Sequence, residues 1–368
     1  MARAGLSSRW KCAFANEWDE KKAATYIANW GARELAVVDV AKLKVSDLPS
    51  TPDLVWASFP CQDLSLAGAG AGLKGGRSGT FWPFWRLMQD LAHDGRAPKL
   101  VVLENVCGTL TSHGGRDFSR ICEALSGNYR FGAIVADAAA FLPQSRPRLF
   151  IVGVHKSIPI ASALHQGEGS SPWHTRALID AHSNLRPTLK ADWIWWSLPS
   201  PPAVRTVFSD LIEDEPQGVA WHTPAETKRL LSMMSELNIA KVKRAQSLRR
   251  KVVGTVYKRT RPDPDGTKVQ RAEVRFDEIA GCLRTPAGGS SRQLILVVEG
   301  NKVRSRLISQ RETARLMGLS DDYRLPQNYN EAYHLTGDGV AVPVVRYLSD
   351  MLLAPLLSDP QKSKRRAA

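Results

Sequence analysis

Short apolar runs alternate with amphipathic stretches over the first 155 residues of the chain. The runs are rich in Val, Leu, Ile and Ala, which is typical of buried strands. They cover Leu35–Val40, Asp53–Ser58, Leu100–Leu103, Phe131–Ala136 and Leu149–Val154. Helix-like stretches lie between them at Glu20–Trp30, Phe81–His93 and Arg116–Leu125. This alternation predicts an α/β fold with a doubly wound, mainly parallel sheet.

The pattern changes after residue 155, where proline, tryptophan and charged residues become frequent. Three later runs, Val252–Arg261, Val269–Phe276 and Gln293–Glu299, have the composition of strands and predict a second, smaller domain. The tryptophan-rich segment Trp193–Trp196 is predicted to lie in a core rather than to stack on bases.

The composition of the chain predicts a polyanionic partner. The chain has 368 residues, 43% of them hydrophobic, and a formal net charge of +14 with a pI near 9.7. Such an excess of positive charge favours nucleic acid and salt-sensitive binding. No apolar run approaches 18 residues and no signal-type leader opens the chain, so we expect a cytoplasmic protein.

Three short motifs with chemically reactive side chains lie next to the predicted strands. Cys61 lies in the sequence Ser-Phe-Pro-Cys-Gln after the second run, Glu104 follows the third, and Arg146 and Arg148 precede the last. Ligands of a doubly wound sheet bind at the carboxyl ends of its strands, so Cys61 and Glu104 are expected to share a cleft. A lone cysteine at a strand end is usually an inert small hydrophobe. A thiol, a carboxyl group and a forked cation together are what attack on a pyrimidine ring requires.

In their order and spacing, these motifs resemble those of the DNA cytosine-C5 methyltransferase family of bacterial and phage type. The resemblance implies that the Cys61 thiolate adds to C6 of a flipped-out cytosine, which activates C5 toward the methyl group of S-adenosylmethionine. Glu104 would then supply a proton near N3, Arg148 would hold the O2 oxygen, and Arg146 would brace the carboxylate or the cysteine loop.

The same resemblance assigns residues to the cofactor S-adenosylmethionine. Glu17 would bind the ribose hydroxyls, Trp18 would lie on adenine, and Asp39 would face the adenine amine. Further contacts are expected from Val40, Phe59, Pro60, Asp338 and Val340. The closing motif departs from the usual Gly-Asn-Ser/Ala form, because Asp338 and Gly339 stand there instead. The segment Ser309–Gly318 resembles the penultimate motif, with Ser309 as helix cap and Glu312 closing a capping box.

The family pattern also implies domain boundaries and DNA contacts. Residues 1–154 would form the catalytic and cofactor-binding domain, 155–300 the target-recognition domain, 301–356 the return to the catalytic domain and 357–368 a basic tail. The glycine-rich tract 67–79 after the nucleophile would act as a lid on double-stranded DNA. The expected DNA contacts are Gln62, Ser65, Lys74, Arg77, Ser78, Arg271, Arg275, Arg284 and Arg292.

One family motif has no counterpart in the sequence. The strand and turn Phe-x-Gly-x-Gly-Gly, which normally approach the methionine end of the cofactor, are missing before Met1. A misplaced start codon, a partner chain that supplies the strand, and a degenerate gene are the alternatives.

The function itself has alternatives: a catalytically impaired DNA-binding homologue, one half of a split methyltransferase, or an RNA cytosine-C5 methyltransferase. A cognate restriction endonuclease is a further expected partner. The remaining cysteines lack Cys-x-x-Cys spacing and are expected to be reduced thiols without zinc: Cys12, Cys107, Cys122 and Cys282.

Overall fold

The computed structural model describes residues 1–49, 51–59, 80–170, 172–262, 265–284 and 292–358. The chain divides into two compact units. Unit 1 comprises Met1–Gly5, Ala138–Arg146 and Pro202–Val344, whereas unit 2 comprises Leu6–Asp137, Pro147–Pro201 and the residues from Val345 on. The division differs from the expected boundary at residue 155, because the chain up to Pro201 packs with the first sheet. Residues 301–344 likewise group with the later strands in unit 1 rather than with the catalytic sheet.

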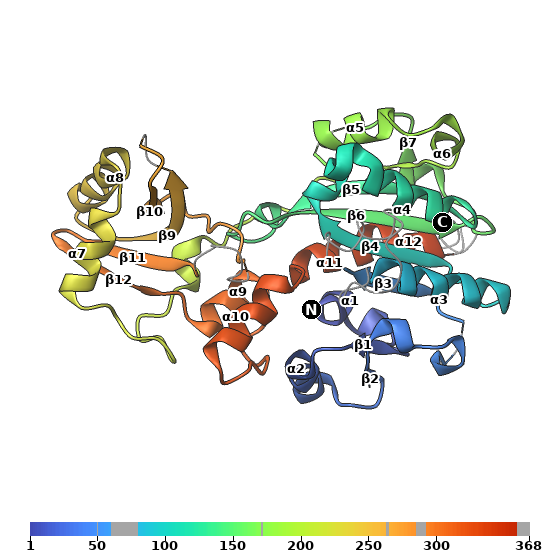
Figure 1. The fold of residues 1–368 in the computed structure, drawn as a ribbon, viewed down its shortest axis with the longest axis horizontal. Helices are drawn as coiled ribbons and strands as arrows, with labels where there is room; N and C mark the ends of the chain where they lie inside the picture. The colour runs from blue at the N-terminus through green and yellow to red at the C-terminus, as the bar shows by residue number, and fades with distance from the viewer. Residues whose placement is uncertain (50, 60–79, 171, 263–264, 285–291, 359–368) are drawn as a thin grey trace, which may run out of the picture. The chain divides into compact units, whose positions relative to one another are not determined.

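The described residues of unit 2 form three sheets (Figure 1). A parallel pair joins β1 and β2, a four-stranded sheet has the order β3-β4-β6-β5, and β7 pairs with β8. The strands are β1 (Ala15–Glu17), β2 (Leu35–Val37), β3 (Leu54–Ser58), β4 (Leu100–Val106), β5 (Tyr129–Asp137), β6 (Pro147–His155), β7 (His165–Gln166) and β8 (Trp195–Trp196).

Three strands of the four-stranded sheet, β3, β4 and β5, run in one direction, as the predicted mainly parallel sheet requires, and only β6 runs the other way. β3 and β4 run parallel, but β6 is antiparallel to both β4 and β5. Only the nine residues 138–146 separate β5 from β6, and they contain no crossover helix of the kind that a parallel connection needs. In the described residues, β1 pairs only with β2, and β3 pairs only with β4, so each of these two strands has one edge without a strand partner.

Helices surround these strands where the sequence predicts them. α2 and α3 have the predicted bounds, and α4 extends one residue further. α2 begins after Asp19, whose carboxylate accepts hydrogen bonds from the backbone N–H groups of Lys21 and Lys22. The helices are α2 (Glu20–Trp30), α3 (Phe81–His93), α4 (Arg116–Ser126), α5 (Arg176–Ser183), α6 (Pro187–Ala191) and α12 (Ala354–Leu357), while α1 (Ala2–Leu6) and α11 (Val342–Leu348) cross the division between the units.

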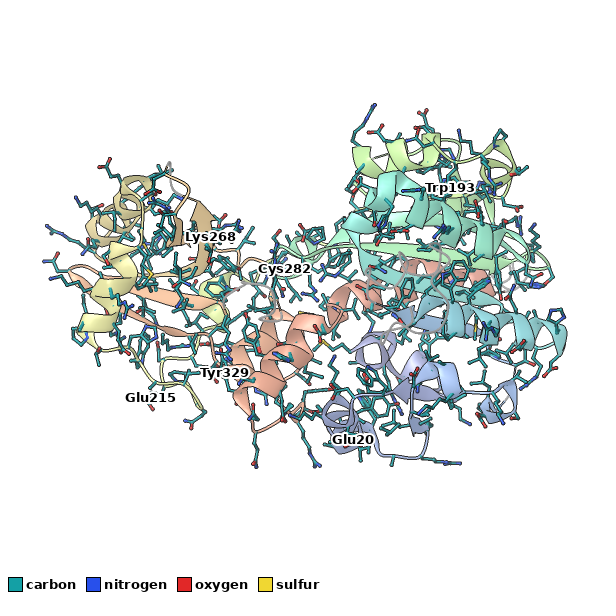
Figure 2. All side chains as sticks on the ribbon, in the orientation of Figure 1. Glu20, Trp193, Glu215, Lys268, Cys282 and Tyr329 are labelled. Atoms are coloured by element: carbon teal, nitrogen blue, oxygen red, sulfur yellow. The ribbon has the colours of Figure 1, made fainter. Side chains whose placement is uncertain are left out.

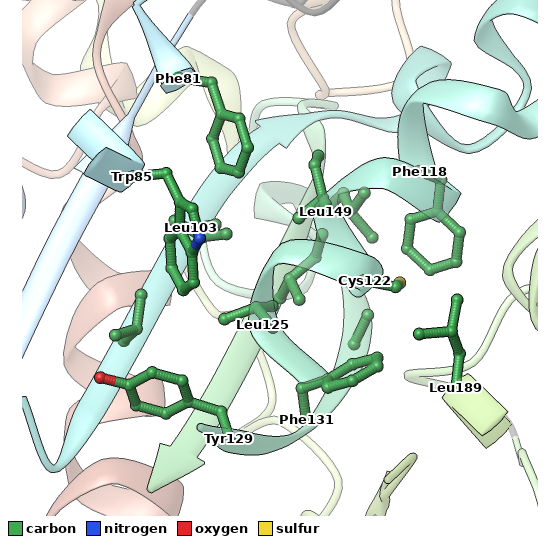
Figure 3. Close-up of a cluster of buried hydrophobic side chains, with 14 of the residues drawn as sticks. Phe81, Trp85, Leu103, Phe118, Cys122, Leu125, Tyr129, Phe131, Leu149 and Leu189 are labelled. Carbon is green, nitrogen blue, oxygen red and sulfur yellow. The ribbon is translucent and has the colours of Figure 1, made fainter. Parts of the chain in front are cut away.

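The core of unit 2 lies between α3, α4 and the four-stranded sheet (Figure 3). Phe81 and Trp85 of α3 and Phe118 and Leu125 of α4 are at most 4% exposed. Every residue of β4 from Leu100 to Asn105 is buried, as expected for a strand covered on both faces. The tryptophan-rich segment joins the same core, since Trp195 belongs to the cluster and Trp193 packs against it. Burial of these side chains provides the rigid platform for the strand ends.

Unit 1 is built on a four-stranded antiparallel sheet of order β10-β9-β11-β12. α7 and α8 pack on one face of it (Figure 1). The shared cluster includes Leu230 of α7, Val242 of α8, Val252 and Val256 of β9, and Leu294, Leu296 and Val298 of β11. The basic residues Lys241, Lys243 and Arg244 lie on α8. The elements are α7 (Pro224–Ser232), α8 (Glu236–Ser247), β9 (Lys251–Pro262), β10 (Lys268–Arg275), β11 (Leu294–Glu299), β12 (Lys302–Leu307), α9 (Gln310–Leu316) and α10 (Tyr329–Asp338).

The start of α9 has the capping box that the sequence predicts. The Ser309 hydroxyl accepts a hydrogen bond from the Glu312 N–H, and the Glu312 carboxylate accepts one from the Ser309 N–H. Glu312 also forms an ion pair with Arg306, with both side chains fully buried. The two guanidinium contacts, 2.8 and 2.6 Å long, satisfy this buried charge and attach the helix to β12.

Candidate active site

Glu104 and Arg148 lie side by side on neighbouring strands of unit 2. In the register of β4 and β6, Glu104 is opposite Phe150 and Arg148 is opposite Val106, so the two charged residues are diagonal neighbours on one face. The Arg148 Nε atom is 3.3 Å from the Glu104 Oε1 atom. The side chain of Glu104 is 8% exposed and that of Arg148 is 15% exposed. The sequence placed both residues in one site, and the structure brings them into contact.

The chain that leads to Cys61 passes beside this pair. Ser58, the last residue of β3, is the register partner of Glu104. The buried Asn105 side chain donates a 3.0 Å hydrogen bond from Nδ2 to the carbonyl oxygen of Phe59. The ring of Phe59 packs on Phe81, with their centroids 5.0 Å apart. Strand pairing, a side-chain hydrogen bond and ring packing therefore fix the backbone two residues before the cysteine.

Asn105 is a site residue that sequence reasoning missed. The sequence assigned it no role, yet its amide connects the end of β4 to the backbone of Phe59. Its Oδ1 atom also accepts a hydrogen bond from the N–H of Val106. A signal was present, because an amide beside a carboxylate inside an apolar run is a buried polar group that needs a partner.

Several predicted residues lie outside the described part of the chain, so their roles stay predictions. They are Pro60, Cys61, Gln62, Ser65, Lys74, Arg77 and Ser78.

Arg146 lies in unit 1, and its expected bracing of the Glu104 carboxylate or of the cysteine loop stays a prediction. Its Nη1 atom is 3.2 Å from the Cys282 Sγ atom and donates to the Leu283 carbonyl oxygen at 3.0 Å. Its Nη2 atom donates to the carbonyl oxygens of Gly337 and Gly339 at 2.7 and 2.5 Å. The side chain is 2% exposed. Arg146 thus fixes the loop of the closing motif, a role that no local pattern could reveal because the contacts span more than 130 residues of sequence.

The predicted adenosine-binding residues of unit 2 lie at the carboxyl ends of β1 and β2. Glu17 ends β1, and Asp39 follows β2 by two residues. The Glu17 Oε1 atom accepts hydrogen bonds from the N–H groups of Trp18 and Asp19. The Asp39 Oδ1 atom accepts one from Ala41, at the start of a 3₁₀ turn, Val40–Lys42. The indole of Trp18 is 73% exposed. An exposed ring next in sequence to the Glu17 carboxylate is suited to a planar base and hydroxyl donors.

The other two predicted cofactor residues belong to unit 1. Asp338 is the last residue of α10, and Val340, 5% exposed, follows it. A Cβ atom added at Gly339 would meet the Met1 Sδ atom at 2.1 Å. Glycine at this position therefore lets the first residue of the chain lie against the closing motif.

The predicted DNA-binding arginines have different surroundings in unit 1. Arg275 is held by Asp277, 2.5 Å from its Nη2 atom, and Arg292 donates to the Asn330 side chain and lies over the Tyr329 ring. Arg284 is exposed. Arg271 is partly exposed on β10, directly opposite Arg259 of β9. The contacts of Arg275 and Arg292 show that both guanidinium groups are engaged within the protein.

The cysteines in the described residues are free. They are Cys12, Cys107, Cys122 and Cys282. Burial raises the pKa of the Cys107 thiol, although the nearby Arg148 acts in the opposite direction.

In the described part of the chain, only Tyr329–Leu357 is long and apolar enough to cross a membrane, and 56% of its most apolar window is buried inside the protein. A buried core helix passes the same test.

Comparisons with known proteins agree with this geometry. A family model described as C-5 cytosine-specific DNA methylase matches residues 1–353. The type II methyltransferase M.BsuFI of Bacillus subtilis is 26% identical over 359 residues, covering 96% of this chain and 70% of the relative. M.HpaII of Haemophilus parainfluenzae is 26% identical over 366 residues, covering 94% and 84%.

Solved structures support the fold. The crystal structure of the S. pombe Dnmt2 methyltransferase has a TM-score of 0.57 at 17% identity and covers 97% of this chain and 95% of that one. A structure of the Entamoeba histolytica methyltransferase EhMeth has a TM-score of 0.58 at 14% identity, covering 96% of each chain. Because the family model spans nearly the whole sequence, the chain belongs to the C-5 cytosine-specific DNA methylase family.

Proposed function

We propose that this protein transfers a methyl group from S-adenosylmethionine to C5 of cytosine in double-stranded DNA. The observation that carries the proposal is the contact between Glu104 and Arg148 at the end of β4, with the entry to the Cys61 loop held beside it by Asn105. A buried carboxyl group and a guanidinium are suited to hold the N3 and O2 edge of one cytosine. Such a base must leave the duplex before it can enter the site.

Each residue has a defined task in this proposal. Cys61 attacks C6 as the thiolate and leaves again when C5 loses its proton. Glu104 donates a proton toward N3, which draws charge from the ring during the attack. Arg148 orients Glu104 in the free protein and shares its guanidinium with O2 when the base is bound. Asn105 positions the loop, and Arg146 acts at a distance by holding the closing motif.

The adenosine half of S-adenosylmethionine, which supplies the methyl group when bound, would be held by Glu17, Trp18 and Asp39. Each carboxylate uses one oxygen for a backbone N–H and has a second oxygen for the ligand. The exposed Trp18 ring supplies the apolar surface on which a purine stacks.

A further strand between β1 and β3 would complete the sheet and the floor of the cofactor site. The edges of β1 and β3, which lack a strand partner in the described residues, support this part of the proposal. The proposal includes a cognate restriction endonuclease as partner and a cytoplasmic location next to the nucleoid, and the similarity to type II methyltransferases supports this part.

Transfer of tritiated methyl groups to duplex DNA and to transfer RNA tests the proposal. Incorporation into duplex DNA, at cytosines identified by bisulfite sequencing, is the expected result. Incorporation into transfer RNA alone would replace DNA by RNA as the substrate. The assay is repeated with a protein to which a strand and the Phe-x-Gly-x-Gly-Gly turn have been added before Met1. Specific DNA binding by this extended protein without any methyl transfer would identify an impaired homologue instead.

A further inference from the structure

The side of α8 that faces away from the sheet of unit 1 carries two exposed leucines. Leu237 is 69% exposed and Leu248 is 49% exposed, whereas Val242 and Ala245 on the opposite side of the helix belong to the hydrophobic core. Leu248 is the residue at which the helix ends, and its backbone still has right-handed helical angles. Figure 2 shows side chains of α8 that project away from the sheet. Two leucines on the solvent side of one helix differ from the single exposed apolar residues that are common on protein surfaces.

The two leucines are the ends of a regular stripe along the helix. The stripe has intervals of four, three and four residues, which keep its members on one side of an α-helix. This is the spacing of the a and d positions at which two helices pack in a coiled coil. At a rise of about 1.5 Å per residue, the stripe spans roughly 16 Å. We call it the α8 seam, and its residues are Leu237, Lys241, Arg244 and Leu248.

The middle of the α8 seam is positively charged. Arg244 is exposed, and further exposed cations lie close to it in sequence, namely Lys243, Arg249 and Arg250. Within the residues that the structure describes, no carboxylate forms an ion pair with any of these four side chains. The one carboxylate of α8, Glu236, lies in the first turn of the helix. These cations are therefore available to a negatively charged partner.

The rest of the α8 seam is suited to close packing. The Lys241 ammonium donates hydrogen bonds to the Asn238 Oδ1 atom at 3.1 Å and to the carbonyl oxygen of Val274 at 3.3 Å. Its charge is thus held against unit 1, and its alkyl stem is the part that a partner would meet. Ala240 and Ser247, which lie beside the seam, are exposed and small. Small side chains at these positions let the backbone of a second helix come close.

Leucines at both ends and cations between them define the chemistry of the partner. A nucleic acid would pair with the cations but would leave the leucines without an apolar surface to pack on. A second copy of the chain, packed seam to seam, would bring like charges together. We propose that the α8 seam binds an acidic amphipathic helix of a partner protein. Apolar residues of that helix pack on Leu237 and Leu248, and a carboxylate between them pairs with Arg244.

A synthetic peptide tests the proposal on the full chain. The peptide is longer than about 15 residues so that it can be helical, and it carries a fluorescent label. It has leucines eleven residues apart and two glutamates between them at the spacing of the seam. Fluorescence anisotropy should show saturable binding to the wild type. Leu237→Ser with Leu248→Ser, and separately Arg244→Glu, should each weaken binding at least tenfold.

Two controls separate the seam from a general attraction between a basic protein and an acidic peptide. Lys228→Glu makes the same charge change at an exposed residue of α7 and should bind within threefold of the wild type. A peptide of identical composition in scrambled order should bind the wild type at least tenfold more weakly. Thermal unfolding of each variant checks that unit 1 remains folded.

Charge reversal on both sides tests the pairing of Arg244 directly. Each glutamate of the peptide is replaced by lysine in turn, because the orientation of the peptide decides which glutamate faces Arg244. One of the two peptides should bind Arg244→Glu within threefold of the original affinity, and it should bind the wild type weakly.

Four results would overturn the proposal. They are no saturable binding of the acidic peptide, binding that is unchanged by loss of the leucines, a tenfold loss of duplex DNA affinity in the leucine variant, and a dimer of the wild type that the leucine variant abolishes. The last two would assign the α8 seam to nucleic acid or to a second copy. The peptide assay contains neither DNA nor S-adenosylmethionine, so its result does not depend on the proposed function.

Discussion

The Nε atom of Arg148 lies 3.3 Å from the Oε1 atom of Glu104, and both side chains are largely buried. In the free protein this contact holds the carboxyl group of Glu104, a residue whose register partner on β3 is Ser58. Because a buried charge without a partner is unfavourable, the pair orients itself before a base arrives.

Glu104→Gln should lower the rate of methyl transfer by roughly 10²–10⁴, the usual range for loss of a general acid. The amide keeps the size of the side chain and still accepts a hydrogen bond from Arg148, so the fold should be retained. Single-turnover kinetics with saturating DNA measures the effect, and a thermal scan of the variant checks the fold. A rate within threefold of the wild type would remove Glu104 from the chemistry.

Arg146→Met should destabilise unit 1, because the backbone carbonyl oxygens of Leu283, Gly337 and Gly339 lose their charged donor. Each unsatisfied buried acceptor costs about 1–3 kcal/mol. Urea denaturation should show a lower midpoint, and Arg146→Lys should recover part of the loss.

The matched control for this prediction is Arg176→Met, since the Arg176 side chain is 86% exposed. Its effect should stay within about 0.5 kcal/mol, as for most surface substitutions. Equal midpoints for Arg146→Met and Arg176→Met would show that the buried contacts of Arg146 are not needed for stability.

The stability of unit 2 should fall as the pH decreases below about 6.5. Burial lowers the pKa of His174 from its ordinary value of 6.5, and burial followed by the charge of Lys190 lowers that of His182. The unfolded chain therefore takes up protons first as the pH falls through 6.5, and stability that is present at neutral pH is lost until the folded histidines are also protonated.

His174→Gln tests this pH dependence, because glutamine retains an acceptor for the Ser170 N–H but cannot take up a proton. The midpoint of thermal unfolding should change less between pH 7.5 and pH 5 in this variant than in the wild type, because one fewer group binds protons differently in the folded and unfolded states. His165→Gln, at an exposed site, is the control. The same slope in all three proteins would refute the assignment to His174.

Adding a strand with the sequence Phe-x-Gly-x-Gly-Gly before Met1 should tighten S-adenosylmethionine binding at least tenfold, about 1.4 kcal/mol. The strand would offer backbone hydrogen bonds to the edges of β1 and β3 and should also raise the melting temperature. An extension of equal length made of Gly and Ser is the control. Calorimetry that gives equal affinities for the two extended proteins would contradict the proposed gap.

Sequence reasoning predicted most of the elements of the first sheet because their signals are local. The periodicity of α2 and α3 gave their bounds, and Asp19 is a recognisable N-cap. The site residues Glu104 and Arg148 were predicted from motifs that follow or precede strands, and their contact follows from strand register.

The features that the sequence did not show have non-local causes. The antiparallel direction of β6 depends on the short connection between β5 and β6, and the contacts of Arg146 with Cys282 join segments more than 130 residues apart. The second domain was predicted to begin at residue 155 because composition changes there, but Trp195 is in fact part of the first core. The helices α7 and α8 were missed, since their charges masked a narrow apolar stripe that includes Leu230 and Val242.

Covalent trapping at Cys61 tests the central claim most directly. Duplex DNA with 5-fluorocytosine at its target positions is incubated with S-adenosylmethionine and the protein, after methyl transfer to ordinary DNA has been demonstrated. The account predicts a denaturation-resistant adduct, because fluorine blocks the final elimination, and a peptide map that places the DNA on Cys61. Cys61→Ser should form no adduct and transfer no methyl groups, while its DNA affinity stays within a few-fold of the wild type. An active protein that forms no adduct, or forms it on another cysteine, would contradict the account.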